Sequence, residues 1–201
     1  MNAPSEVTAT RDRILKVADR MFYRQGLRAV GVDALASELG MSKKTLYRHF
    51  PSKDELVIAY LKGRFRPLPA ASTRPPGEQI LRNFEWFARS LEMAEDYRGC
   101  AYLNALAELG DEPSEARQLA FEFKESRRLW YRELLSRLNV EDPDTLATQL
   151  ALLIDGAYSA ALARKDRSVG WAAVAAARVL LKSAGVQIAA EISPLPQGGR
   201  K

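Results

Sequence analysis

Apolar residues recur with helical spacing along almost the whole chain. Near the N-terminus, a stripe with the spacing i, i+3, i+4, i+7 and i+8 is formed by Ile14, Val17, Ala18, Met21 and Phe22. Gly26 ends this pattern. No segment alternates apolar and polar residues in the way a half-buried strand does, and no internal repeat is present. The sequence therefore predicts an all-α fold.

Capping residues and a glycine divide the first part of the chain into four predicted helices. Gly40 separates the second predicted helix, residues 32–39, from a third that begins after Ser42. Ser52 and Glu55 have the S-x-x-E spacing of a capping box, which predicts the start of a fourth helix. The first third of the chain therefore contains several short helices in close succession.

A proline-rich segment, RPLPAASTRPPG, occupies residues 66–77. Prolines at this density cannot continue a helix, so the segment is predicted to be a linker. It separates two expected domains, 7–67 and 78–190, and the tail after Ser193 is predicted to be disordered. The later domain holds five helical patterns, at residues 78–96, 100–109, about 114–138, 144–166 and 171–185.

Positive charge is concentrated in the first third of the chain. Residues 1–66 hold 13 Lys or Arg and 7 Asp or Glu, a net charge of +6. Residues 67–201 hold 17 and 18, a net charge of −1. A basic region beside a neutral one indicates that the first third binds a polyanion, although a solvated basic face without a partner would have the same charge.

The segment GMSKKTLYRHF, residues 40–50, has two contrasting sides. At 100° per residue, Leu46 and Phe50 fall together on one side of the predicted helix, and Lys44, Thr45 and Arg48 lie opposite them. Arg and Lys can contact guanine edges or phosphates, and a Thr methyl group can contact a thymine methyl group. A short helix, a tight turn and an exposed helix are typical of a helix-turn-helix unit. A solvated helical hairpin is the alternative.

Short motifs follow one another in a fixed order through this region. They are Gly26, the V-x-x-[IL]-A pattern at residues 32–36, the G-[VM]-S-x-x-[TL]-[LI]-Y-x-[HY]-F pattern at residues 40–50, and x-S-K-x-x-L ending at Leu56. With these motifs, residues 11 to about 65 resemble the N-terminal domain of TetR-family transcriptional repressors. Val30 and Gly31 stand where the family usually has Thr or Ser, so this chain lacks the hydroxyls that commonly make a cap or phosphate contact there.

The resemblance implies an all-α homodimer of about nine helices. A three-helix N-terminal helix-turn-helix domain would bind double-stranded DNA, and a C-terminal helical domain would bind a small-molecule effector and dimerise. Effector binding would move the two DNA-reading heads apart and release an inverted-repeat operator. The resemblance implies base-facing roles for Lys44, Thr45 and Arg48. The residues expected to position phosphates are Ser42, Lys43, Tyr47, His49 and Lys53.

The later part of the chain resembles the family more weakly. Residues 98–109, RGCAYLNALAEL, are similar to a stretch of one subgroup of these regulators, which indicates no particular ligand. Aromatic residues in 84–87 and 121–131 could line an apolar pocket between helices, or they could be ordinary core. The residues predicted for an effector pocket are Phe84, Trp86, Phe87, Cys100, Asn104, Phe121 and Trp130.

The last two predicted helices are rich in small apolar residues. Helices of this composition can pack with a symmetry mate into a four-helix bundle, or they can complete the core of the protomer. Two-fold symmetry would require two half-sites on one face of the DNA. The residues predicted for the dimer interface are Leu150, Ile154, Ala157, Tyr158, Ala161, Val174 and Leu181.

Other classes of protein are less compatible with the sequence. The single cysteine, Cys100, fits a reducing compartment, and the apolar stretch 150–163 is shorter than a membrane span, so we expect a cytoplasmic protein without a membrane partner. The single histidine, His49, lies in the other predicted domain from Cys100, and no phosphate loop or metal-ligand spacing is present. We therefore expect no enzyme, cofactor or metal. A redox-sensing regulator that uses Cys100 and a basic adaptor that ignores DNA sequence are the alternatives.

Overall fold

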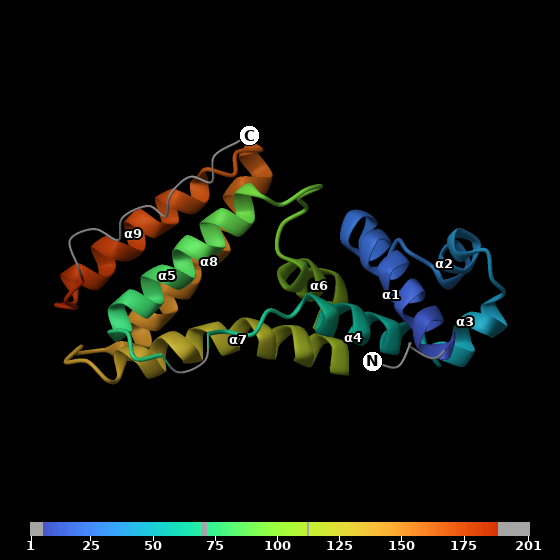
Figure 1. The fold of residues 1–201 in the computed structure, drawn as a ribbon, viewed down its shortest axis with the longest axis horizontal. Coiled ribbons are helices and arrows are strands. Elements are labelled where there is room, and N and C mark those ends of the chain that lie inside the picture. The colour runs from blue at the N-terminus through green and yellow to red at the C-terminus, as the bar shows by residue number, and fades with distance from the viewer. Residues whose placement is uncertain (1–5, 70–71, 112, 189–201) are drawn as a thin grey trace. The chain divides into compact units, whose positions relative to one another are not determined.

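The computed structural model describes residues 6–69, 72–111 and 113–188, which form nine α-helices (Figure 1). The first four are α1 (Glu6–Gln25), α2 (Val32–Leu39), α3 (Lys43–His49) and α4 (Lys53–Arg64). The other five are α5 (Pro76–Glu92), α6 (Ala101–Leu109), α7 (Glu115–Leu135), α8 (Pro143–Arg164) and α9 (Val169–Ser183). The predicted all-α fold is confirmed. The predicted disorder after Ser193 concerns residues outside the described part of the chain.

The linker is shorter than predicted because proline is compatible with the first turn of a helix. α5 begins at Pro76, with Pro75 as its N-cap, rather than at residue 78. The N–H that proline lacks would be unpaired at this position in any case, and its fixed φ angle suits the helix. At its other end α5 stops at Glu92 rather than at residue 96, and Met93 caps it.

The chain divides into two compact units. The first unit contains Met1–Leu68, Ala94–Arg127 and Tyr158–Lys165, and the second contains Pro69–Met93, Arg128–Ala157 and Asp166–Lys201. The first unit thus adds α6 and parts of α7 and α8 to the four N-terminal helices. The functional domains predicted at 7–67 and 78–190 follow the linker instead, and they stay a prediction.

The core of the first unit is built from the apolar sides of its short helices. Ile14 of α1, Leu35 of α2, Leu46 of α3 and Leu61 of α4 are each at most 2% exposed, and Ala105 of α6 is 1% exposed. Helices of seven or eight residues are marginal by themselves in water, so this shared burial is what stabilises α2 and α3.

The turn between α2 and α3 depends on a left-handed glycine. Gly40 has φ 61° and ψ 36°, and its N–H donates to the carbonyls of Ala36 and Ser37 at the end of α2. Residues with a side chain adopt this conformation at a cost, whereas glycine does so freely. The turn is therefore short enough for α3 to start at Lys43, directly after its cap.

The second unit has a core built around α5. Phe84 and Phe87 of α5 and Tyr131 of α7 are almost fully buried, and the rings of Phe84 and Tyr131 stack with centroids 5.8 Å apart. The hydroxyl of Tyr131 donates to Oδ1 of Asn83 at 2.8 Å, which satisfies two buried polar groups. α9 packs along α5, and Gly170 in its first turn lies so close to Ala88 of α5 that a Cβ atom there would be 2.9 Å from the Ala88 Cα atom.

By length and apolar composition alone, α8 could cross a membrane. Core helices of water-soluble proteins pass the same test. Leu146, Leu150 and Ile154 on one side of α8 are buried in the protein itself, and Asp155 lies in the middle of the helix.

The N-terminus of α8 is capped by Asp142. Its carboxylate accepts the N–H of Thr145 at 3.0 Å, and this hydrogen bond lowers the pKa of that carboxyl group.

Candidate nucleic-acid interface

α3 begins at a capped N-terminus that also fixes the position of Thr45. The hydroxyl of Ser42 accepts the N–H of Thr45 at 3.1 Å, as predicted for an N-cap, and lies 3.0 Å from the Thr45 hydroxyl. Ser42 is exposed and Thr45 is half-buried. The two hydroxyls therefore already bond to each other at the start of α3, and a phosphate or a base would share them.

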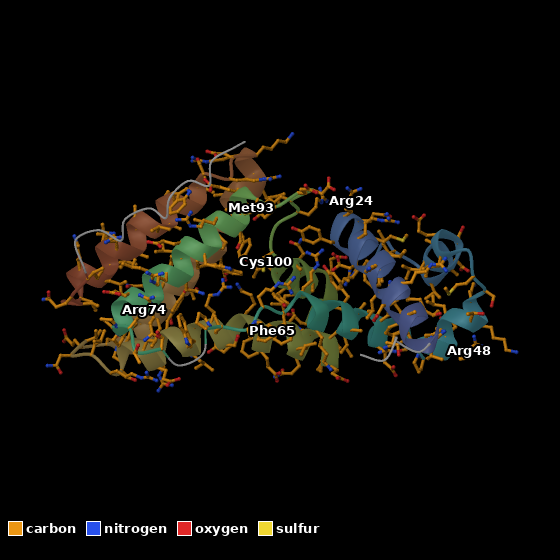
Figure 2. All side chains as sticks on the ribbon, in the orientation of Figure 1. Arg24, Arg48, Phe65, Arg74, Met93 and Cys100 are labelled. Atoms are coloured by element: carbon orange, nitrogen blue, oxygen red, sulfur yellow. The ribbon has the colours of Figure 1, made fainter. Side chains whose placement is uncertain are left out.

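The two sides of α3 differ as the sequence predicts. Leu46 and Phe50 are 2% and 1% exposed and belong to the core of the first unit. Lys44, Tyr47 and Arg48 are exposed, and Figure 2 labels Arg48 on the outer side of α3. Because long cationic side chains and a tyrosine ring stand together on this side, α3 can present charge and hydrogen-bond donors to a DNA groove.

Lys43 is paired within the protein. Its Nζ lies 2.5 Å from Oδ1 of Asp33 in the first turn of α2. The hydrogen bond and the charge of Asp33 raise the pKa of Lys43 above its ordinary value. A phosphate would thus have to compete with Asp33 for this ammonium group. The sequence alone does not predict this pair, because ten positions separate the two residues and the Gly40 turn brings them together.

Arginines of α1 hold the ends of the two short helices. Nη1 of Arg11 donates to the carbonyl of His49 at 2.5 Å, and its guanidinium group lies 3.9 Å from the centroid of the Phe50 ring. Arg13 donates to the carbonyl of Leu39 at the end of α2. These side chains bind carbonyls that the helices themselves leave unpaired. They fix the direction of α3, and no local sequence signal reveals them.

The entrance to α2 lacks a side-chain cap. Val30 is 1% exposed and belongs to the core, and Gly31 is the N-cap without a side-chain hydrogen bond. The entrance to α2 thus has no hydroxyl where the family usually has Thr or Ser, and the Val30 side chain is buried in the core instead. At the start of α4, Ser52 accepts the N–H of Glu55 at 3.0 Å, and half-buried Lys53 opens the helix.

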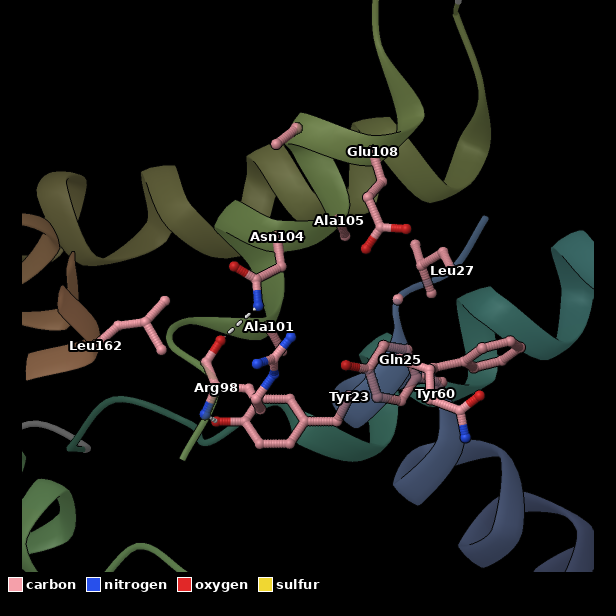
Figure 3. Close-up of a pocket in the computed structure, with 13 residues that line it drawn as sticks. Tyr23, Gln25, Leu27, Tyr60, Arg98, Ala101, Asn104, Ala105, Glu108 and Leu162 are labelled. Atoms are coloured by element: carbon pink, nitrogen blue, oxygen red, sulfur yellow. Dashed lines mark hydrogen bonds between the residues drawn. The ribbon is translucent and has the colours of Figure 1, made fainter. Parts of the chain in front are cut away.

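A cavity of about 400 Å³ lies in the first unit between the end of α1 and α6 (Figure 3). Its wall includes Tyr23 of α1, Tyr60 of α4, and Asn104 and Glu108 of α6. The Tyr60 side chain is buried, and this burial raises the pKa of its hydroxyl group above the ordinary value. Arg98 completes one end of the cavity from the segment before α6.

Hydrogen bonds hold the wall of this cavity in place at both of its ends. The hydroxyl of Tyr23 donates to the carbonyl of Gly99 at 2.9 Å and accepts the N–H of Arg98 at 3.0 Å. At the other end, Oε2 of Glu108 accepts the N–H of Arg28 at 2.8 Å. Gly26 has φ 95°, and a Cβ atom there would lie 2.8 Å from the same oxygen. The turn after α1 therefore sits directly on the Glu108 carboxylate.

The residues predicted for an effector pocket lie in different places. Phe84 and Phe87 are core residues of the second unit, and Cys100 is buried at the start of α6. Trp86 and Phe121 are about half exposed, at 49% and 48%. Trp130 is half-buried beside Tyr131. The cavity between α1 and α6 includes Asn104, and its other lining residues come from outside the predicted set.

The residues predicted for the dimer interface are mostly buried within the protomer. Tyr158 is half-buried, and the other six, Leu150, Ile154, Ala157, Ala161, Val174 and Leu181, are each at most 7% exposed. Side chains with so little free area complete the core and leave almost nothing for a partner to cover. The large apolar residues that are exposed on the same two helices are Leu152, Leu162 and Val179.

Comparison with known proteins places this arrangement in a wider group. Residues 14–60 match the family model described as "Bacterial regulatory proteins, tetR family". The crystal structure of a TetR transcriptional regulator from Streptomyces avermitilis is 37% identical, with 88% of this chain and 98% of that chain covered and a TM-score of 0.76. A TetR-family regulator from Streptomyces coelicolor, SCO4454, is 27% identical over 88% of this chain and 96% of its own, with a TM-score of 0.79.

A curated relative matches the N-terminal part. The HTH-type transcriptional repressor KstR2 of Mycolicibacterium smegmatis is 32% identical over 81 residues. This match spans 37% of the present chain and 40% of the repressor. The similarity to KstR2 is thus restricted to less than half of that protein, whereas the two solved structures match over almost their whole length.

Proposed function

The chain belongs to the TetR family of bacterial regulatory proteins, and from this premise we propose that it is a repressor that an effector releases from an inverted-repeat operator. Regulation of transcription through DNA binding follows from the family itself, whose members are regulators and not enzymes. The repressor role is supported by the name of KstR2. A cytoplasmic location fits a protein that binds the chromosome.

The observation that carries the proposal is the outer side of α3. Lys44, Tyr47 and Arg48 are exposed on it, while Leu46 and Phe50 anchor the opposite side in the core. We assign base contacts to Lys44, Thr45 and Arg48. Contacts to phosphates are assigned to Ser42, Lys43, Tyr47, His49 and Lys53. Thr45, His49 and Lys53 are half-buried, so they have less free surface than the other five residues, which are exposed.

A homodimer would give two copies of α3 the spacing of successive major grooves, about 34 Å. Exposed apolar residues of α8 and α9, Leu152 and Val179, support a contact between protomers through those helices. Dimerisation would remove the apolar surface of both residues from water, which is favourable. Because a closed dimer is symmetric, its operator would contain the same half-site twice in opposite directions.

Selection of bound sequences from a random DNA pool tests this proposal. The full-length protein is expected to enrich an inverted repeat and to bind it on the order of 10³-fold or more above random DNA. Enrichment of unrelated sequences, with affinity that simply collapses as salt rises, would instead identify a basic adaptor. A single half-site without its inverted copy would contradict the dimer while retaining the reading helix.

A promoter assay separates repression from activation. With the selected operator placed over a promoter, the protein is expected to lower transcription in a purified system. The redox alternative is tested in parallel, since operator binding by wild type and by Cys100→Ser should respond alike to peroxide if buried Cys100 has only a packing role. A response confined to the wild type would assign the signal to the thiol.

A further inference from the structure

The cavity between α1 and α6 is lined at its two ends by groups of opposite charge. Figure 3 shows the Glu108 carboxylate reaching in from α6 near Leu27, and the Arg98 guanidinium group reaching in from the segment before α6. Ala101 and Ala105 lie between them on the same side of α6. Ala101 and Glu108 are seven residues apart, so about 10 Å of helix separates their Cα atoms.

These polar groups have unused bonding capacity. Oε1 of Glu108 and the Arg98 guanidinium group make no hydrogen bond or ion pair with any residue that the structure describes, and they do not pair with each other. Asn104, which also lines the cavity, donates through Nδ2 to the carbonyl of Arg98 at 2.7 Å. Polar groups that converge on a partly apolar cavity of this size are typical of a small-molecule site.

The middle of the cavity is apolar. Leu27, Ala101 and Ala105 form part of it, and the rings of Tyr23 and Tyr60 face it from α1 and α4. Arg64 already lies over the Tyr23 ring, 3.8 Å from its centroid, and is held there by Asp19 at 2.6 Å. Because one cation already covers the Tyr23 ring, a bound ammonium group is expected at Glu108 instead.

We infer that this cavity binds a small zwitterion whose ammonium and carboxylate groups stand at opposite ends of a flat apolar body. The ammonium group pairs with Glu108, the carboxylate with Arg98, and the body lies over Ala101 and Ala105. The two charges are then matched at both ends without a net charge in the cavity. Charge-assisted hydrogen bonds of this kind are shorter and stronger than neutral ones.

The position of Glu108 connects such a ligand to the DNA-reading helices. The same carboxylate holds the N–H of Arg28 in the turn that leads to Val30 and α2. An ammonium group at Oε1 draws the negative charge of the carboxylate away from that N–H and weakens their hydrogen bond, so binding favours a conformation with a displaced turn. A ligand shifts the equilibrium only by its difference in affinity between the two conformations, and this consequence rests on the proposed function.

Isothermal titration of the full-length protein with 4-(aminomethyl)benzoate tests the site. This probe has one charge at each end of a ring, and benzylamine and 4-methylbenzoate each retain one of the charges. The zwitterion is expected to bind at least about tenfold more tightly than either analogue, because each analogue leaves one charged group of the protein without its partner. Equal affinities of the three compounds would overturn the assignment.

Two variants assign the ends of the probe. In Glu108→Gln the zwitterion should bind no better than 4-methylbenzoate does, and in Arg98→Gln no better than benzylamine does. Glutamine retains an acceptor for the Arg28 N–H, and Arg98 is exposed, so both variants are expected to fold. If neither substitution lowers the affinity for the zwitterion, the probe binds elsewhere and the inference is wrong.

A second pair of variants tests the cavity itself. Ala107 lines the cavity and is exposed, so Ala107→Trp is expected to fill the entrance and abolish binding without disturbing the core. Ala163→Trp is the matched control, because Ala163 is equally an exposed helical alanine of the first unit but does not line the cavity. Loss of binding in both, or in neither, would contradict the location.

Operator binding separates this inference from the proposed function. With the selected operator, 4-(aminomethyl)benzoate should lower the affinity for DNA in the wild type and leave it unchanged in Glu108→Gln. Binding of the probe without an effect on the operator would retain the site and remove its regulatory role. If selection yields no operator while the probe still binds, the site stands and the proposed function fails.

Discussion

α3 and α9 both bury one side in their own unit, but their outer sides carry different chemistry. α3 turns Lys44 and Arg48 outward over buried Leu46, whereas α9 turns Ala175 and Val179 outward over buried Val174 and Leu181. A charged side cannot be covered without a partner of opposite charge, while an exposed apolar side gains free energy when another apolar surface covers it. One helix is thus suited to a polyanion and the other to a second protein surface.

The two helices are also held in different ways. α3 has seven residues and is fixed by side chains from its neighbours, such as Arg11 on the carbonyl of His49. α9 has 15 residues and packs along α5 through small residues. Substitutions on the outer side of α3 should therefore affect binding, and those on the inner side of α9 should affect folding.

The largest effect is expected from Leu181→Ala on the inner side of α9. Leu181 is 0% exposed, and the cavity left by the substitution should lower the free energy of unfolding by about 2–5 kcal/mol. Urea denaturation measures this loss. Val179→Ala is the matched control, because Val179 is 63% exposed. The free energy of unfolding of this variant protomer should change by less than about 1 kcal/mol. Equal losses would mean that α9 has no distinct inner side.

The next effect concerns the outer side of the same helix. Val179→Asp should weaken the homodimer about a hundredfold, because each protomer would bring an unpaired carboxylate into the interface. Sedimentation velocity over a range of protein concentrations measures the dissociation constant. Val7→Asp is the control, since Val7 of α1 is 65% exposed and should leave the dimer intact. A Val179→Asp protein that stays dimeric would exclude this side of α9 from the interface.

On α3, the effect should appear in DNA binding rather than in stability. Arg48→Ala is expected to cost about 1–3 kcal/mol of operator affinity and to relax the preference at one base position. Lys53→Ala should weaken all sequences alike and reduce the salt slope by about one. Fluorescence anisotropy with the selected operator and with single-base variants of it distinguishes the two. Identical behaviour of both variants would contradict the division into base and phosphate contacts.

The smallest effect is expected where α2 meets α3. Asp33→Asn removes the partner of Lys43, and the freed ammonium group should raise the affinity for random DNA a few-fold and increase the salt slope by up to about one. The Asp33–Lys43 pair is exposed, so the stability of the protein should change by less than about 1 kcal/mol. A salt slope that does not change would show that Lys43 makes no phosphate contact.

The same difference between the helices explains what the sequence could predict. The α3 segment places charges on one side and two large apolar residues on the other, so the sequence alone distinguishes its inner side from its outer side. α8 and α9 are apolar on several sides. Leu150, Ile154, Val174 and Leu181 are buried in the protomer, and nothing in their residue type distinguishes an apolar side that faces the core from one that would face a partner.

Contacts between distant positions could not be predicted either. The pair of Asp33 with Lys43, the contact of Arg11 with His49 and that of Glu108 with the turn at Gly26 all join residues brought together only by folding. The cavity between α1 and α6 arises in the same way, from segments of the chain about 80 positions apart, as Arg28 and Glu108 show. Local propensity and periodicity contain no information about such long-range contacts.

The shortness of α3 limits how much sequence one protomer can read. Seven residues extend about 10 Å along the helix axis, and base pairs are stacked about 3.4 Å apart, so α3 can face only three or four of them. Two copies would define about six to eight base pairs, a combination that random DNA contains about once in 4,000 to 65,000 positions. A chromosome of several million base pairs would then hold on the order of a hundred to a thousand chance matches. The stiffness of the DNA between and around the half-sites has to supply the remaining discrimination.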